Sequence, residues 1–213
     1  MLTDVEVRVL GSLVEKQLTT PEYYPLTLNA LTAACNQKSN RDPVVSYVET
    51  TILAAVDSLR DKNLVYLFYG SSSRTVKYKH MLPSVFDISP QEVAVLAVLM
   101  LRGPQTLGEL RERTGRMHEF ASVGEVQETL DSLIRRDEPL VVKLERQPGQ
   151  KEARFAHLLS GEVKAETFSA PSAQRTASSD GDRVEKLEQE VADLRRELTE
   201  FRSMFDEFRK QFE

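Results

Sequence analysis

A segment of about 80 residues occurs twice in this chain, and that repeat is the strongest constraint on its fold. The first repeat opens with "LTDVEVRVLGSL" at Leu2, and the second opens with "ISPQEVAVLAVL" at Ile88. In each repeat a hydroxyl residue lies three positions before a glutamate, which is the capping box of a helix N-terminus, and apolar residues then recur at helical spacing. Each repeat is therefore predicted to begin with a helix.

Two more helices are predicted in each repeat. The second helix is short and lies in "LTLNAL" (26–31) and in "QTLGEL" (105–110), with Thr27 and Thr106 as N-caps. In the first repeat we expect the third helix to start with Asp42 as its N-cap and Pro43 in its first turn. The triplet "DSL" recurs in both third helices. Apolar stripes on these helices predict core residues, which are Val45, Val48, Ile52, Ala55, Val56 and Leu59 in the first repeat and Val123, Val126, Leu130, Leu133 and Ile134 in the second.

Each third helix is followed by sequence with the two-residue period of β-strands. Two β-rich runs surround Gly70 and a serine cluster, and two more surround Pro148 and Gly149. Three helices followed by a hairpin is the plan of a helix-turn-helix unit with a β-hairpin wing. We therefore expect a mainly α fold with small β-hairpin wings, made of tandem winged-helix domains at 1–86 and 87–160.

The C-terminal part of the chain has a different composition. Residues 161–182 are rich in Ala, Ser, Thr, Gln and Pro with few apolar anchors, which is typical of a flexible linker. Residues 183–213 carry apolar residues in a heptad pattern, which predicts a C-terminal coiled-coil helix. The expected dimerisation positions are Val184, Leu187, Val191, Leu194, Leu198, Phe201, Phe205 and Phe208.

Charges beside the heptad favour a parallel homodimer. With Val184 at position a, three pairs of opposite charge would meet across a parallel dimer, namely Arg183 with Glu188, Glu190 with Arg195, and Glu197 with Arg202. Other arrangements stay open. The helix could fold back on its own domains or remain single, and its Phe-rich end could anchor another protein.

Composition sets the class of protein. The net charge is −5, yet residues 1–86 carry nine basic and eight acidic side chains and are the least acidic part. The N-terminal stretch has acids where a signal peptide has basic residues, and no apolar run approaches the roughly 18 residues that span a bilayer. We therefore expect a cytoplasmic protein that does not enter a membrane. Cys35 is the only cysteine, and we expect it to be a small buried residue.

Residues suited to catalysis are scarce. The chain has no Gly-rich phosphate loop, no Cys/His spacing for zinc and no His-Glu-His motif on a helix. His118 is isolated, whereas His80 and His157 hold equivalent places at the ends of the two wings, which indicates a shared structural role. No catalytic residue, metal site or cofactor is predicted, and we expect a protein that is not an enzyme.

The stretch "NQKSNRDPVVSY" (36–47) is the strongest candidate for a DNA contact. It precedes the third helix, which enters the major groove in winged-helix DNA binders. A basic helix start beside a basic wing predicts contact with double-stranded DNA. The expected contact residues are Lys38, Asn40, Arg41, Ser46, Tyr47 and Thr50, with Arg74, Lys77 and Lys79 from the wing.

Another interpretation fits the same residues. Asn, Lys, Ser and Asp are also ordinary turn residues, and Glu49 and Asp57 on the third helix would repel phosphate. In the second repeat, Arg113 precedes a third helix with Glu125 and Glu128, which suits protein docking better than DNA contact. The alternative is an interaction scaffold whose winged-helix domains dock protein partners, at the second domain or at the Phe-rich C-terminus.

Three stretches resemble a known family. They are "LTDVEVRVLGSLVEKQLTTPEYYPLTLNAL", "CNQKSNRDPV" and "LRGPQTLGELRERTGRMHEF", and they are similar to the YceH-type family of uncharacterised bacterial proteins. The resemblance covers about residues 1–160. It implies a cytoplasmic bacterial protein of tandem winged-helix fold, and it supplies no functional site.

These observations lead to one main hypothesis. We expect a homodimeric DNA-binding or transcription-associated protein, in which the coiled coil fixes the spacing of two recognition helices. The scaffold alternative resembles the acidic tandem winged-helix subunits of bacterial chromosome-condensation complexes.

Overall fold

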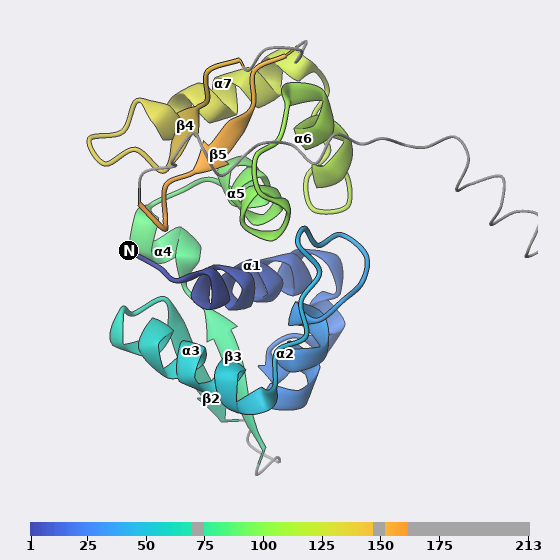
Figure 1. Ribbon diagram of the computed structural model, residues 1–213, viewed down its shortest axis with the longest axis vertical. Coiled ribbons are helices and arrows are strands. Elements are labelled where there is room, and N and C mark those ends of the chain that lie inside the picture. The colour runs from blue at the N-terminus through green and yellow to red at the C-terminus, as the bar shows by residue number, and fades with distance from the viewer. Residues whose placement is uncertain (70–74, 147–151, 162–213) are drawn as a thin grey trace, which may run out of the picture. The chain divides into compact units, whose positions relative to one another are not determined.

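The structure is a computed structural model that describes residues 1–69, 75–146 and 152–161 (Figure 1). Residues Met1–Ala165 group into one compact unit. Its described part is mainly helical, with two small antiparallel sheets. The predicted coiled coil at 183–213 lies outside the described residues, as does the predicted linker at 161–182 apart from Gly161.

The first repeat contains the three helices and the hairpin that the sequence predicts. The capping box at its start is confirmed, because the Thr3 amide donates to Glu6 Oε2 at 2.7 Å and the Glu6 amide donates to Thr3 Oγ1 at 3.3 Å. A short first strand was not predicted. The elements are α1 (Asp4–Thr19), a 3₁₀ turn (Pro21–Tyr23), β1 (Leu26–Thr27), α2 (Leu28–Cys35), α3 (Glu49–Asp61), β2 (Val65–Tyr69) and β3 (Val76–His80).

The second repeat has the same order of elements. Its capping boxes at Ser89 and Thr106 are confirmed. A bridge from Gln105 to Phe155 takes the place that β1 has in the first repeat. The elements are α5 (Pro90–Arg102), α6 (Leu107–Thr114), α7 (Val123–Ile134), β4 (Val141–Lys143) and β5 (Phe155–His157), with α4 (Leu82–Phe86) between the repeats.

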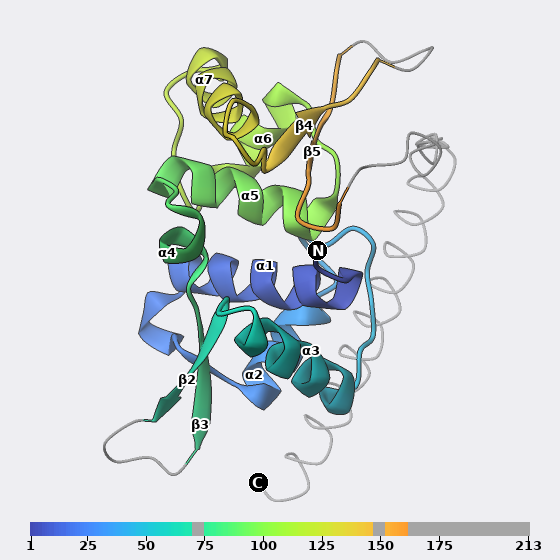
Figure 2. The ribbon, with the colours of Figure 1, turned by 90° about the vertical axis from the view of Figure 1, so that its left-hand side faces the viewer.

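The first helices of the two repeats, α1 and α5, pack against each other (Figures 1 and 2). Gly11 allows this approach, since an added Cβ atom would lie 3.0 Å from Met100 Cβ and 3.1 Å from Leu101 Cγ. Both helices are buried almost all round, over Glu6–Glu15 and Glu92–Leu101. One hydrophobic core therefore runs through both repeats.

The third helices bury most of the predicted stripes. Four positions of the first stripe and three of the second are buried, namely Ile52, Ala55, Val56 and Leu59, and Val126, Leu130 and Leu133. Val48 and Val123 were predicted to be core residues, and both are exposed. Both lie at the N-terminal ends of their helices, where the chain leaves the core.

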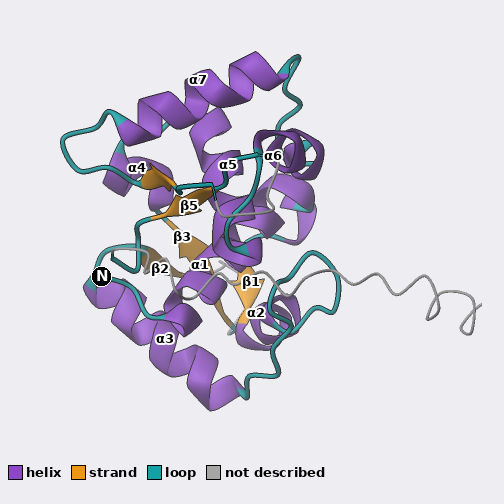
Figure 3. Cartoon of the chain, turned by 45° about the horizontal axis from the view of Figure 1, so that its top comes forward, coloured by secondary structure: helices purple, strands orange, loops and turns teal. Residues whose placement is uncertain are grey.

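The start of α3 differs from the prediction. Asp42 and Pro43 belong to the loop 36–48, which Figure 3 shows between α2 and α3, and the helix begins only at Glu49. The Asn36 side chain holds the far end of this loop, because its Nδ2 donates to Tyr47 O at 2.8 Å and its Oδ1 accepts from the Tyr47 amide at 2.8 Å. Tertiary hydrogen bonds thus override the local capping preference of Asp42.

Candidate interaction surface of the first repeat

Arg41 does not lie where a phosphate contact requires it. The residue is only 5% exposed. Its Nη1 and Nη2 donate to Glu15 Oε1 and Oε2 at 3.1 and 2.7 Å, and its Nε and Nη2 donate to Ala34 O at 3.2 and 2.8 Å. The guanidinium is therefore used to fasten loop 36–48 to α1 and α2. The structure thus places Arg41 inside the fold instead of on the surface, and its partner Glu15 lies 26 residues earlier in the sequence.

Two other residues of the stretch also serve the loop. Asn40 is in the left-handed region with a φ of 58°, and its Oδ1 accepts from Arg102 Nη2 of α5 at 2.8 Å. Tyr47 is half-buried and joined through its backbone to Asn36. Lys38 and Ser46 remain exposed. Most of the polar character of 36–47 is thus explained by the fold.

A second buried arginine supports the same loop. Arg8 of α1 donates from Nη2 to Pro43 O at 2.6 Å and from Nη1 to Cys35 O at 3.5 Å. Burial lowers its pKa, and the nearby charge of Arg41 lowers it further. Cys35 lies beside it and is fully buried, as predicted, and burial raises the pKa of its thiol to about 11. This thiol is therefore not a nucleophile near neutral pH.

The wing brings two of the predicted lysines onto one face of its sheet. In the β2–β3 register, Phe68 lies opposite Lys77 and Tyr66 lies opposite Lys79, so the four side chains share a face. Tyr66 is 51% exposed and Phe68 is 45% exposed. This outer face of the wing combines aromatic and cationic side chains. Arg74 lies outside the described residues.

The solvent side of α3 is apolar and acidic. Six exposed positions at helical spacing form this outer face of α3, namely Thr50, Leu53, Ala54, Asp57, Arg60 and Asp61. The cation on this face is Arg60, whose Nη1 donates to Asp57 Oδ1 at 2.9 Å. Thr50 is therefore exposed, as the sequence suggested, but its surroundings are not basic.

The cation at the end of α3 is also used by the fold. Lys62 donates to the buried carboxylate of Glu6 on α1. Burial works to raise the pKa of Glu6, but hydrogen bonds from Lys62, Ser58 and Thr3 outweigh it and lower the pKa to about 2. In the second repeat Ser132 Oγ donates to Glu92 Oε1 at 2.8 Å. The recurring "DSL" triplet therefore places a serine that binds the capping-box glutamate of the first helix.

The two wing histidines occupy equivalent places. His80 pairs with Val65 in the first sheet, and His157 pairs with Val141 in the second. Burial lowers the pKa of each imidazole to about 4, and the charge of Lys79 adds to this effect at His80. Both side chains are neutral near pH 7, which agrees with a structural role for them.

Charged residues of the second repeat form internal contacts. Arg113 donates to Gln105 and lies 3.4 Å from Glu109, and Arg154 lies 2.9 Å from Glu109. Glu125 Oε2 accepts from the Ala121 amide at 2.8 Å at the start of α7. Glu128 is exposed. The arrangement gives no cationic surface along α7.

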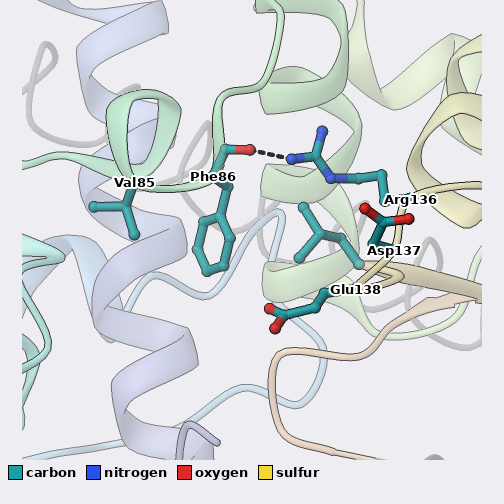
Figure 4. Close-up of a pocket in the computed structure, with 6 residues that line it drawn as sticks. Val85, Phe86, Arg136, Asp137 and Glu138 are labelled. Atoms are coloured by element: carbon teal, nitrogen blue, oxygen red, sulfur yellow. Dashed lines mark hydrogen bonds between the residues drawn. The ribbon is translucent and has the colours of Figure 1, made fainter.

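A pocket of about 420 Å³ lies beside α4, at the junction of the repeats (Figure 4). Val85, Phe86 and Leu140 supply its apolar lining, and Asp137 and Glu138 stand on its rim. The guanidinium of Arg136 donates to Phe86 O and to Asp87 O. Arg136 therefore connects α4 to the segment after α7.

The described residues contain neither a cluster of His, Cys, Asp and Glu suited to a metal ion nor a helix long and apolar enough to cross a membrane. The predicted dimerisation positions, Val184 to Phe208, lie outside the described residues. No position of the coiled coil can therefore be placed on this surface.

The chain was compared with known proteins. Residues 2–150 match the family model described as "Protein of unknown function, DUF480". A UPF0502 protein from Opitutus terrae is 56% identical over 92% of this chain and 84% of its own length. A UPF0502 protein from Geobacter sulfurreducens is 53% identical over 100% of this chain and 99% of its own length, and one from Aliivibrio fischeri is 46% identical over 92% of each chain. These matches confirm the resemblance to a family of uncharacterised bacterial proteins, and the chain belongs to the DUF480 family of UPF0502 proteins.

Proposed function

We propose that this chain is a protein-interaction module without enzymatic activity, built from two winged-helix units and acting in the cytoplasm. Each repeat has three helices and a hairpin, and β1 or Gln105 adds a third extended segment to each small sheet. This order of elements supports the proposal of winged-helix units. The buried α1–α5 contact would hold the two units in a fixed relation to each other.

The outer face of α3 carries the argument for a protein partner. In a winged-helix DNA reader this helix lies in the major groove, where it needs hydrogen-bond donors and cations. Here the face presents Leu53 and Ala54 beside the carboxylates of Asp57 and Asp61. Arg60 pairs with Asp57, so Asp61 leaves the face with a net negative charge. This charge would repel phosphate, whereas a protein surface with apolar and basic groups would be complementary.

Photo-crosslinking in cells tests this proposal. A benzoylphenylalanine residue placed at Leu53 should give a discrete adduct with one protein. Asp57→Lys in the same chain should abolish that adduct, because it reverses a charge on the proposed docking face. The matched control carries the photo-crosslinker at Tyr23, an exposed aromatic residue outside this face. Equal adducts at both positions, or none at Leu53, would reject the proposal.

A second candidate function is contact with double-stranded DNA through the wing. Lys77 and Lys79 on the outer face of the wing favour it, with Lys38, Ser46 and Thr50 as the remaining candidates from the first stretch. Anisotropy with a random-sequence duplex between about 50 and 200 mM salt tests it. If both lysines contact phosphates, replacing them by alanine should lower the slope of log binding constant against log salt concentration by about two. An unchanged slope would exclude the wing.

Homodimerisation through 183–213 remains a proposal that rests on the heptad pattern. Deletion of 183–213 should convert a dimer into a folded monomer, as measured by light scattering and circular dichroism. A dimer that persists after the deletion would show that another surface holds the molecules together.

A further inference from the structure

Strand β2 leaves one edge of the first sheet open. The strand order is β1-β3-β2, and β2 pairs with β3 alone in the described part of the chain. Figure 2 shows the hairpin of β2 and β3 extending beyond the helices. An open edge is a template for another strand, because its backbone donors and acceptors lack strand partners.

The ladder with β3 shows which backbone groups face this edge. The Met81 amide donates to Leu64 O at 2.8 Å, directly before the first paired residues of β2 and β3. Backbone groups alternate along an antiparallel strand, so those of Tyr66 and Phe68 are directed to β3. The N–H and C=O groups of Val65, Leu67 and Tyr69 are therefore directed to the open edge.

Strand β2 itself carries none of the residues that usually protect an open edge. From Leu64 to Tyr69 the sequence is "LVYLFY", without a charge or a proline, and Tyr66, Phe68 and Tyr69 are 51%, 45% and 66% exposed. The equivalent edge strand of the second repeat, β4, follows Pro139, contains the exposed Lys143 and leads into Glu145. Natural proteins protect free edges with charges and prolines, as β4 does. The contrast between the repeats indicates that β2 is covered in the functional protein.

We infer that a second molecule of this chain covers the edge, with its own β2 antiparallel to the first and the two-fold axis at Leu67. In this register Leu67 meets its counterpart, and Val65 meets Tyr69 of the second molecule. These are the residues whose backbone groups face outward, so each such pair can exchange two hydrogen bonds. The strand is thus complementary to itself.

The side chains fit the same register. Tyr66 faces Phe68 of the second molecule at a position where antiparallel side chains approach most closely, which favours aromatic pairs. We call this contact between the two β2 strands the seam. Strand β2 has no charge, so no like charges oppose each other across it. Lys77 and Lys79 lie on β3, so the lysines of the two molecules are separated by three strand spacings, about 14 Å.

The seam is too small to hold two molecules together by itself. One pair of five-residue strands buries less than the roughly 1,200 Å² of a stable interface, so the seam needs a second contact to raise the effective concentration. The proposed dimer through 183–213 would supply that contact, and in this respect the inference rests on the proposed function. The test below separates the two.

Disulfide trapping in the full-length chain tests the seam. A chain with Tyr66→Cys and a differently tagged chain with Phe68→Cys are co-expressed, purified together and oxidised. The expected product is a disulfide-linked pair that carries both tags, because these positions are opposite each other in the seam. Cys35 contributes no background, since it is buried.

Two controls define the register. Chains that all carry Tyr66→Cys should cross-link poorly, since the two positions are diagonal and their Cβ atoms are about 7 Å apart, too far for a disulfide. Chains with Tyr23→Cys report random collisions. No more cross-linking in the mixed pair than in these controls would overturn the seam, and light scattering on the same sample would show separately whether the dimer through 183–213 exists.

A charge-swap experiment gives an independent readout. Tyr66→Glu with Phe68→Glu in one chain, and Tyr66→Lys with Phe68→Lys in another, would each place like charges opposite each other. Neither chain alone should form the seam, and mixing them should raise the fraction of mixed pairs above that of random pairing through 183–213, as measured by native mass spectrometry. Lys79 and Lys77 lie opposite these two positions in the hairpin, so circular dichroism must first show that the lysine chain keeps the fold of the glutamate chain. Failure of the mixture to favour the mixed pair would overturn the two-fold register.

Discussion

Arg41 and Glu15 form a buried ion pair in which Nη1 and Nη2 of the guanidinium reach Oε1 and Oε2 of the carboxylate at 3.1 and 2.7 Å. The pair joins loop 36–48 to α1, and the Arg41 side chain has no exposed surface. Arg41, a basic residue in the loop before α3, therefore stabilises the fold of the first repeat. The stretch 36–47, which looked like a DNA contact, owes part of its composition to the packing of the first repeat.

We predict that Arg41→Ala destabilises the protein by about 3–5 kcal/mol, because it leaves the Glu15 carboxylate buried without its partner. Urea denaturation followed by circular dichroism measures the change. Lys38→Ala is the matched control, since Lys38 is exposed in the same loop and its replacement should change the free energy of unfolding by less than about 0.5 kcal/mol. A cost for Arg41→Ala as small as that of Lys38→Ala would contradict the assignment.

Local patterns in the sequence predicted the elements well. The capping boxes at Thr3, Ser89 and Thr106 lie where expected, because a cap depends on residues within one helical turn. The order of three helices and a hairpin was also predicted in both repeats. The "DSL" triplet recurs for a reason that only the structure reveals, which is the contact between its serine and the capping-box glutamate.

Long-range contacts explain what the sequence did not predict. Asp42 looked like an N-cap, but hydrogen bonds from Arg8 to Pro43 O and from Asn36 to Tyr47 O keep the chain non-helical up to Val48. The outer sides of α1 and α5 are buried because each repeat covers the other, which no periodicity within a single helix can show. The surface that the structure exposes differs from the predicted DNA contact for the same reason. Arg41 is buried, whereas Leu53 and Asp57 face solvent.

A second prediction concerns acid stability and Glu6. Its pKa is lowered from 4.5 to about 2, so the folded state holds the proton less tightly than the unfolded state. The stabilisation is therefore complete above pH 4.5 and is lost as pH falls toward 2. Glu6→Gln should be less stable than the wild type at pH 7, on the order of 2 kcal/mol, and this difference should shrink on acidification. Urea denaturation of both proteins at several pH values measures it, and a constant difference would contradict the shift.

A third prediction concerns the wing histidines at milder pH. The pKa of His157 is lowered from 6.5 to about 4 by burial, so the unfolded state binds a proton that the folded state excludes. Stability should be complete above pH 6.5 and should fall as pH decreases toward 4. His157→Phe should remove about one proton from this dependence, or about 1.4 kcal/mol per pH unit between the two values. Glu6→Gln is the control, because its effect belongs to the range below pH 4.5.

The contact between α1 and α5 leads to a fourth prediction, which compares two glycines in helices. Gly11→Ala adds a Cβ atom 3.0 Å from Met100 Cβ, so the helices must separate, and we expect a loss of about 1–3 kcal/mol in the free energy of unfolding. Gly108→Ala in α6 meets no atom within 4 Å, so the higher helix propensity of alanine should stabilise the protein by up to about 1 kcal/mol. Thermal and urea denaturation of both variants measure whether each substitution raises or lowers the free energy of unfolding. If both substitutions stabilise the protein, the repeats are not packed through Gly11, and α1 and α5 would each need another partner to cover their outer sides.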